Sequence, residues 1–223
     1  MLGPSRRRFA VTAVVLSVLI LASCSNDPIV SATRPTKEDI EKQQFPAPQG
    51  SIPALMRMGE AMRQAGDAKN ALGYFRRAHQ IDLFDPEPLV KIGVTLNDLR
   101  QYNEAVDVFT DTLALDHNNT EALRGLGAAL IGVNQPALAI ENLKAALEIE
   151  ADHRTYNALG VASDHLGDHA AAQTYYSEGL KIFPNNLTLK NNLGLSQILS
   201  GNLAGAIDTL VAAAQLPMSF SVE

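Results

Sequence analysis

The sequence is poor in several residue types on which chemical function often depends. It has no tryptophan and a single cysteine, so it contains no pair of thiols for an internal disulfide. Lys and Arg together number 18 against 24 Asp and Glu, which gives a formal net charge of −6. This balance is not the basic footprint of a nucleic-acid-binding protein, and we expect no nucleic acid partner.

Motifs for catalysis are missing as well. The sequence has no Gly-x-Ser-x-Gly nucleophile motif and no phosphate-binding glycine loop. His165 and His169 are four residues apart with aspartates beside them, but Gly167 interrupts the helix between them, so we expect the two imidazoles to diverge. We therefore predict a non-enzymatic protein with no catalytic residues, no metal and no cofactor.

The N-terminal apolar run is too short to span a bilayer. Phe9–Leu21 comprises 13 residues, whereas a membrane-spanning helix needs about 20. Three arginines, Arg6, Arg7 and Arg8, precede this run, and a positive region before a short apolar run is typical of an export signal. We predict that residues 1–23 are a signal peptide.

The residues that end this run suggest a lipid anchor. Leu21-Ala22-Ser23-Cys24 resembles the bacterial lipobox, which implies that Cys24 receives a diacylglyceryl group and becomes the mature N-terminus. Several acyl chains make a durable anchor. Ser25 stands where an Asp commonly retains lipoproteins in the inner membrane, so the resemblance implies a periplasm-facing position on the outer membrane. The alternative is an ordinary signal peptide with an incidental cysteine.

Residues 24–51 have the composition of a flexible tether. Prolines recur among mostly polar residues, which leaves little capacity for a core. We expect one short helix over residues 36–44, with Thr36 as its N-cap. The prolines are Pro28, Pro35, Pro46 and Pro48.

A periodic pattern governs the rest of the chain. Five glycines recur at steps of 34, 34, 33 and 34 residues, and five alanines follow them twelve residues later. A period of this length predicts a stacked array of helical hairpins. With each glycine at position 8, the units span residues 52–85, 86–119, 120–152, 153–186 and 187–216, followed by a C-terminal tail, 217–223. The glycines are Gly59, Gly93, Gly127, Gly160 and Gly194.

Each unit predicts two antiparallel helices. Apolar positions 4, 7 and 11 share one face of the first helix, and positions 20, 24 and 27 share one face of the second. Gly66-Asp67, Gly167-Asp168 and Gly201-Asn202 predict turns in which a left-handed residue ends one helix and a cap opens the next. A small residue at position 8 allows the two helices to approach closely.

This pattern resembles the tetratricopeptide repeat. The resemblance implies an all-α, right-handed superhelical solenoid of about five helix-turn-helix repeats. Three residues depart from it: Ser163 and Gln197 at the normally large position 11, and Lys190 at the normally large position 4. We interpret these departures as looser packing or a polar contact late in the array.

In the tetratricopeptide repeat, positions 2, 5, 9, 12 and 13 of the first helices face a concave groove that binds protein partners. Asn157 and Asn191 occupy equivalent positions, and amide side chains that both donate and accept are suited to gripping an extended peptide backbone. The alternative is that both are merely exposed asparagines. The predicted partner-binding residues are Asn157, Asn191, Val161, Leu195, Ile198 and Arg124.

The tail has an alternating apolar pattern at Met218, Phe220 and Val222. Solenoids need a cap on their last unit, so we interpret the tail as a lid over that unit. The alternative is a strand that pairs with a partner.

A closer resemblance covers roughly residues 150–216. Tyr156–Ala162, Leu166–His169 and Asn191–Ser196, together with the lipobox, are similar to the tetratricopeptide lipoprotein of tight-adherence (Flp) pilus assembly. This implies a non-catalytic outer-membrane scaffold that helps the pilus secretin to localise or assemble. Two alternatives stay open. One is a type IV pilotin or a barrel-assembly accessory lipoprotein, and the other is an adaptor for cell-wall enzymes.

Overall fold

The computed structural model describes residues 50–215. The chain divides into two units, residues 1–44 and 45–223, and all the described helices belong to the second. The predicted signal peptide, Cys24, the helix over 36–44 and the tail 217–223 lie outside the described residues, as does almost all of the tether.

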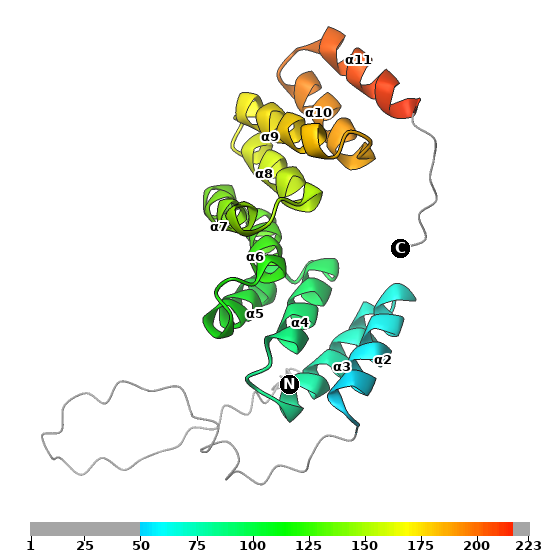
Figure 1. Cartoon of the computed structure of the whole chain (residues 1–223), viewed down its shortest axis with the longest axis vertical. Coiled ribbons are helices and arrows are strands. Elements are labelled where there is room, and N and C mark those ends of the chain that lie inside the picture. Colours follow the sequence, from blue (N-terminus) through cyan, green and yellow to red (C-terminus); the bar gives the residue numbers. More distant parts are fainter. Residues whose placement is uncertain (1–49, 216–223) are drawn as a thin grey trace, which may run out of the picture. The chain divides into compact units, whose positions relative to one another are not determined.

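The described part of the chain is entirely helical, with ten α-helices and no strand (Figure 1). This confirms the predicted all-α solenoid. The helices are α2 (Ile52–Gln64), α3 (Ala68–Ile81), α4 (Pro86–Asp98), α5 (Tyr102–Leu115), α6 (Thr120–Gly132), α7 (Pro136–Ile149), α8 (His153–His165), α9 (His169–Ile182), α10 (Leu187–Leu199) and α11 (Leu203–Ala214).

The helices form five hairpins that stack in sequence order. Each helix packs on the next along the chain, and α4, α6, α8 and α10 also pack on one another in turn. Within residues 50–215, the second helices of the hairpins make no comparable contact among themselves. We therefore call α2, α4, α6, α8 and α10 the inner helices, and α3, α5, α7, α9 and α11 the outer helices.

The turns inside the hairpins follow the predicted chemistry. Gly66, Gly167 and Gly201 adopt φ values of +81°, +76° and +81°, a region that glycine enters without steric cost. Arg100 and Asn134 adopt the same left-handed conformation without being glycine, at φ 58° and 60°. The residue after each glycine accepts a backbone N–H with its side chain and so caps the next helix, namely Asp67, Asp168 and Asn202.

The position-8 glycines leave room for a large side chain of the same hairpin. A Cβ atom added at each of them would lie less than 3 Å from the side chain at position 24. The space that glycine provides is therefore occupied by a ring or a leucine, which explains why the ladder keeps this residue. The position-24 residues are Phe75, Phe109, Leu143, Tyr176 and Leu210.

The core crosses the 33-residue step without a break. One buried cluster runs from Ala71 to Ala162, and a smaller cluster comprises Tyr156, Ala172, Tyr176 and Leu189. The second cluster joins the last two hairpins, because α8, α9 and α10 all contribute to it.

The three departures from the repeat pattern have different outcomes. Ser163 is buried, and its hydroxyl donates to the carbonyl oxygen of Leu159 at 2.9 Å, which is a polar contact of the predicted kind. Gln197 has a buried Oε1 atom with no hydrogen-bond partner among the described residues. Leu189, adjacent to Lys190, is fully buried and fills the core at this point, so packing there is not loose.

Candidate protein-binding surface

The apolar residues predicted for the groove lie on two successive inner helices. Val161 is half-buried on α8, whereas Leu195 and Ile198 are exposed on α10. Asn191 is also exposed on α10. α8 and α10 thus offer apolar side chains together with an unburied amide, a composition suited to contact with a polypeptide.

Arg124 forms an ion pair within the chain. Its Nη1 atom lies 2.7 Å from Oδ2 of Asp152, and both side chains are largely buried. Asp152 is the N-cap of α8, where its Oδ1 accepts the backbone N–H of Arg154. This ion pair therefore fixes α6 to the start of α8.

Asn157 likewise contacts a neighbouring hairpin. Its Oδ1 atom accepts a hydrogen bond of 2.6 Å from Nδ2 of Asn192. The amide at the equivalent repeat position, Asn191, is exposed and not part of this pair. The structure therefore joins Asn157 to Asn192, and a peptide clamp made by Asn157 and Asn191 stays a prediction.

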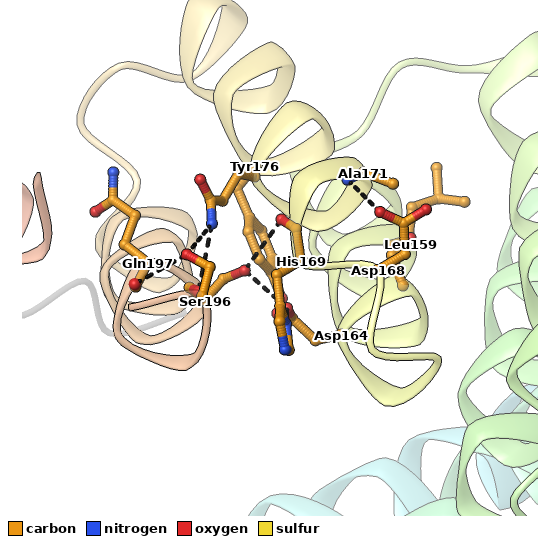
Figure 2. A network of polar contacts seen from close by, with 11 residues as sticks. Leu159, Asp164, Asp168, His169, Ala171, Tyr176, Ser196 and Gln197 are labelled. Carbon is orange, nitrogen blue, oxygen red and sulfur yellow. Dashed lines mark hydrogen bonds and ion pairs between the residues drawn. The ribbon is translucent and has the colours of Figure 1, made fainter. Parts of the chain in front are cut away.

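A carboxylate network lies where the fourth and fifth hairpins meet. Figure 2 shows Asp164 of α8, His169 and Tyr176 of α9, and Ser196 of α10 turned toward one another. Oδ1 of Asp164 lies 2.8 Å from Nδ1 of His169 and accepts from the Ser196 hydroxyl at 2.7 Å, while Oδ2 accepts from the Tyr176 hydroxyl at 3.1 Å. One side chain thereby ties together three helices.

The hydrogen bond from Tyr176 to Asp164 requires a protonated phenol, and burial favours that state. Burial of the phenol, and then the nearby Asp164 charge and the hydrogen bond to it, raise the pKa of Tyr176 far above its ordinary value of 10.0. The hydroxyl therefore stays a donor to Asp164 at every physiological pH.

The two histidines at the turn between α8 and α9 have different surroundings. His169 is held by Asp164, whereas His165 is exposed. Residues 50–215 contain no group of three or more His, Cys, Asp or Glu side chains placed to bind a metal ion. They also contain no helix that is long and apolar enough to cross a membrane.

Polar contacts between hairpins recur along the inner helices. Arg63 of α2 takes part in such a contact and also pairs with Glu60 of its own helix at 2.8 Å. The hydrogen bond from Arg63 holds the pKa of the Glu60 carboxyl below its usual value. Besides those of α8 with α10, contacts between successive inner helices include Arg63 with Asp98 at 3.3 Å, Lys91 with Glu121 at 3.4 Å, and Nδ2 of Asn97 with the Gly125 carbonyl at 2.9 Å.

Sequence reasoning missed an exposed apolar row on the last helix. Leu203, Ile207 and Val211 of α11 are all exposed, and Leu199 of α10 is exposed beside them in the chain. The spacing of the α11 residues, four apart, places them on one face. Residues at the same repeat positions in earlier hairpins contact the next inner helix, as Tyr102 and Gln173 do, whereas no further helix follows α11 in the described residues.

Comparison with known proteins agrees with this architecture. The tetratricopeptide repeat matches residues 53–80 and 153–186. The Hsp70-Hsp90 organizing protein of Triticum aestivum is 32% identical over 94 residues, which cover 42% of this chain and 16% of that protein.

Two solved structures share the fold. MamA from Desulfovibrio magneticus RS-1 has a TM-score of 0.64 at 25% identity, covering 74% of this chain and 94% of that one. PilF of Pseudomonas aeruginosa has a TM-score of 0.64 at 20% identity, covering 74% and 75%.

The fold and these matches define a solenoid of tetratricopeptide type, a class of protein that acts as a scaffold for protein–protein interaction.

Proposed function

We propose that this protein is an outer-membrane lipoprotein that binds protein partners during assembly of a tight-adherence pilus apparatus, with the secretin as its client. Three observations support the proposal: the lipobox-like residues ending at Cys24, the resemblance over residues 150–216, and the repeat scaffold. The observation that carries it is the exposed apolar surface of Leu195 and Ile198, because this surface lies within the family-like stretch.

The anchor is tested by metabolic labelling with radioactive palmitate followed by membrane fractionation. We expect the unchanged chain to incorporate label and the Cys24→Ser variant to incorporate none, because the acyl acceptor is lost. Ser25→Ala is the matched control and keeps the label. Label in Cys24→Ser would contradict the anchor.

Localisation is tested separately through Ser25. We expect the unchanged chain to sediment with the outer membrane, and Ser25→Asp to move it to the inner membrane. An unchanged chain that fractionates with the inner membrane would contradict the proposed location.

The client is tested in a strain that lacks the gene. We expect fewer secretin multimers and fewer surface pili, both restored by the unchanged chain. The double variant Leu195→Lys with Ile198→Lys should fail to restore them. Ile149→Lys, at an exposed apolar residue of α7, is the control and should restore both.

Normal secretin multimers and pili in the deletion strain would contradict the pilus role. Affinity capture of the anchored protein separates the alternatives. Recovery of a type IV pilus secretin or of barrel-assembly proteins indicates another client of the same kind, and recovery of cell-wall hydrolases or synthases indicates an adaptor.

A further inference from the structure

The first inner helix has an open face that is covered in every later hairpin. Position 10 is exposed in α2, at Ala61, but fully buried in α4, α6, α8 and α10. Position 7 behaves similarly, because Met58 is 46% exposed whereas Ile92 and Leu126 are at most 7% exposed. In the later hairpins these positions are buried against the preceding hairpin, and none precedes α2 within the described residues. We call Ala54, Met58 and Ala61 the head face.

The last outer helix has the opposite open face. Leu203 and Ile207, at positions 17 and 21, are 61% and 63% exposed. At position 17 of the second hairpin, by contrast, Tyr102 lies beside Gly132 of the next inner helix. At position 21, for example, Gln173 donates through Nε2 to the carbonyl oxygen of Ser196, at position 10 of the next hairpin. No helix covers α11 in the described residues. We call Leu203, Ile207 and Val211 the tail face.

The two faces are complementary in size and polarity. The head face is made mostly of alanines, and the tail face projects large aliphatic side chains that fit against small ones. Ile207 occupies the same repeat position as Gln173, and Ala61 the same position as Ser196. The hydrogen bond between Gln173 and Ser196 inside the chain would thus correspond to an apolar contact between Ile207 and Ala61 at the open ends. Charge does not oppose this contact, because Asp208 is the one ionisable residue of α11 and α2 carries a formal charge of +1 from Arg57, Glu60 and Arg63.

We propose that a second copy of this chain occupies the tail face, so that the head face of one copy stacks on α11 of the next. The contact continues the interface that successive hairpins already form within the chain. Because the two faces differ, it is a heterologous contact that leaves one free end of each kind, and it therefore produces rows of copies instead of closed dimers. The inference does not depend on the pilus role.

Cysteine cross-linking tests the arrangement. The full chain carrying Cys24→Ser, in detergent micelles, has no native thiol and serves as the background. Met58→Cys and Ile207→Cys copies are mixed and oxidised. We expect a mixed dimer, and a ladder of trimers and longer species when both substitutions are on one chain.

Leu138→Cys is the matched control for Met58→Cys, because Leu138 is 47% exposed but lies on the outer helix α7. We expect its cross-linking to Ile207→Cys to be at least tenfold weaker than that of Met58→Cys. Cross-linking at the control level would overturn the proposal, whether the tail face is open or covered by residues 217–223. Dimers of Ile207→Cys alone that form as efficiently as the mixed dimer would also overturn it, because they report a tail-to-tail contact.

Discussion

At the scale of single residues, stability depends on the fit between each position-8 glycine and its position-24 partner. Five such pairs repeat along the chain, and each leaves less than 3 Å for an added Cβ atom. Glycine within a helix costs about 1 kcal/mol relative to alanine. The repeated glycine is therefore retained for space, and the cost of filling that space is measurable.

Gly160→Ala should destabilise the protein by about 1–3 kcal/mol, because the new methyl group overlaps the Tyr176 ring. The measurement is the free energy of unfolding from urea titration. Gly73→Ala is the control, since no atom lies within 4 Å of a Cβ added at this helical position. This control should be neutral or stabilising by up to about 1 kcal/mol. Equal effects of the two substitutions would contradict the packing argument.

His79 gives the stability a dependence on pH. Burial lowers the pKa of His79 below its ordinary value of 6.5, although Asp111, Asp82 and Asp85 act in the opposite direction. Nδ1 of His79 is buried without a hydrogen-bond partner in the described residues. Below pH 6.5 the unfolded chain therefore binds a proton more readily than the folded one, and stability falls as the pH is lowered.

The melting temperature should accordingly decrease between pH 7.5 and pH 5.5, and His79→Gln should make this decrease smaller. Glu60 does not interfere in this range, because its pKa lies below its ordinary value of 4.5. An identical decrease in His79→Gln and in the unchanged chain would show that other groups cause it.

At the scale of helices, the last two hairpins are held together by buried polar groups as well as by apolar packing. Asp164 accepts hydrogen bonds from Tyr176 and Ser196 and contacts His169, so its removal leaves donors on two other helices without an acceptor. An unsatisfied buried donor costs about 1–3 kcal/mol.

Asp164→Ala should therefore lower the free energy of unfolding by about 2–3 kcal/mol. Hydrogen exchange should show faster opening of α10 than of α4 in this variant. Asp208→Ala, at an exposed residue of α11, is the control and should change stability by no more than about 0.5 kcal/mol. A stable Asp164→Ala variant would mean that water replaces the lost acceptor.

The helices and turns were predictable from the sequence, whereas the pairing of side chains was not. Periodicity fixes which positions face the core, and Gly-Asp and Gly-Asn pairs mark helix boundaries by local chemistry. Arg124 and Asn157 lie on the inner helices α6 and α8, and their binding of a partner stays a prediction. Their partners, Asp152 and Asn192, depend on the angle between hairpins, which periodicity does not encode. Arg100 illustrates a second limit, because it takes the left-handed backbone that ends a helix without being a glycine, so its residue type does not signal the turn.

At the scale of the whole repeat domain, the core is unevenly distributed. The large cluster extends over the first four hairpins, whereas the fifth contributes Leu189 to the small cluster. A solenoid is stabilised by contacts between neighbouring units, so a terminal hairpin with one covered side opens more easily.

Amide hydrogens of α10 and α11 should therefore exchange faster than those of α4 to α7 in native-state hydrogen exchange. Self-association through the tail face should reduce this difference at high protein concentration. Uniform exchange at all concentrations would indicate a single cooperative unit.

The side chain that fills the space beside each position-8 glycine also restrains the two helices of its hairpin against sliding. A helix cannot slide along its hairpin partner without driving Phe75, Phe109 or Tyr176 into backbone. Between hairpins, the apolar core is joined by ion pairs of long, partly exposed side chains, such as those of Arg63 and Lys91. Each hairpin therefore resists internal sliding through the side chains that fill its glycine positions, whereas these ion pairs between hairpins can adjust to small changes of angle when a bound partner pulls on the array.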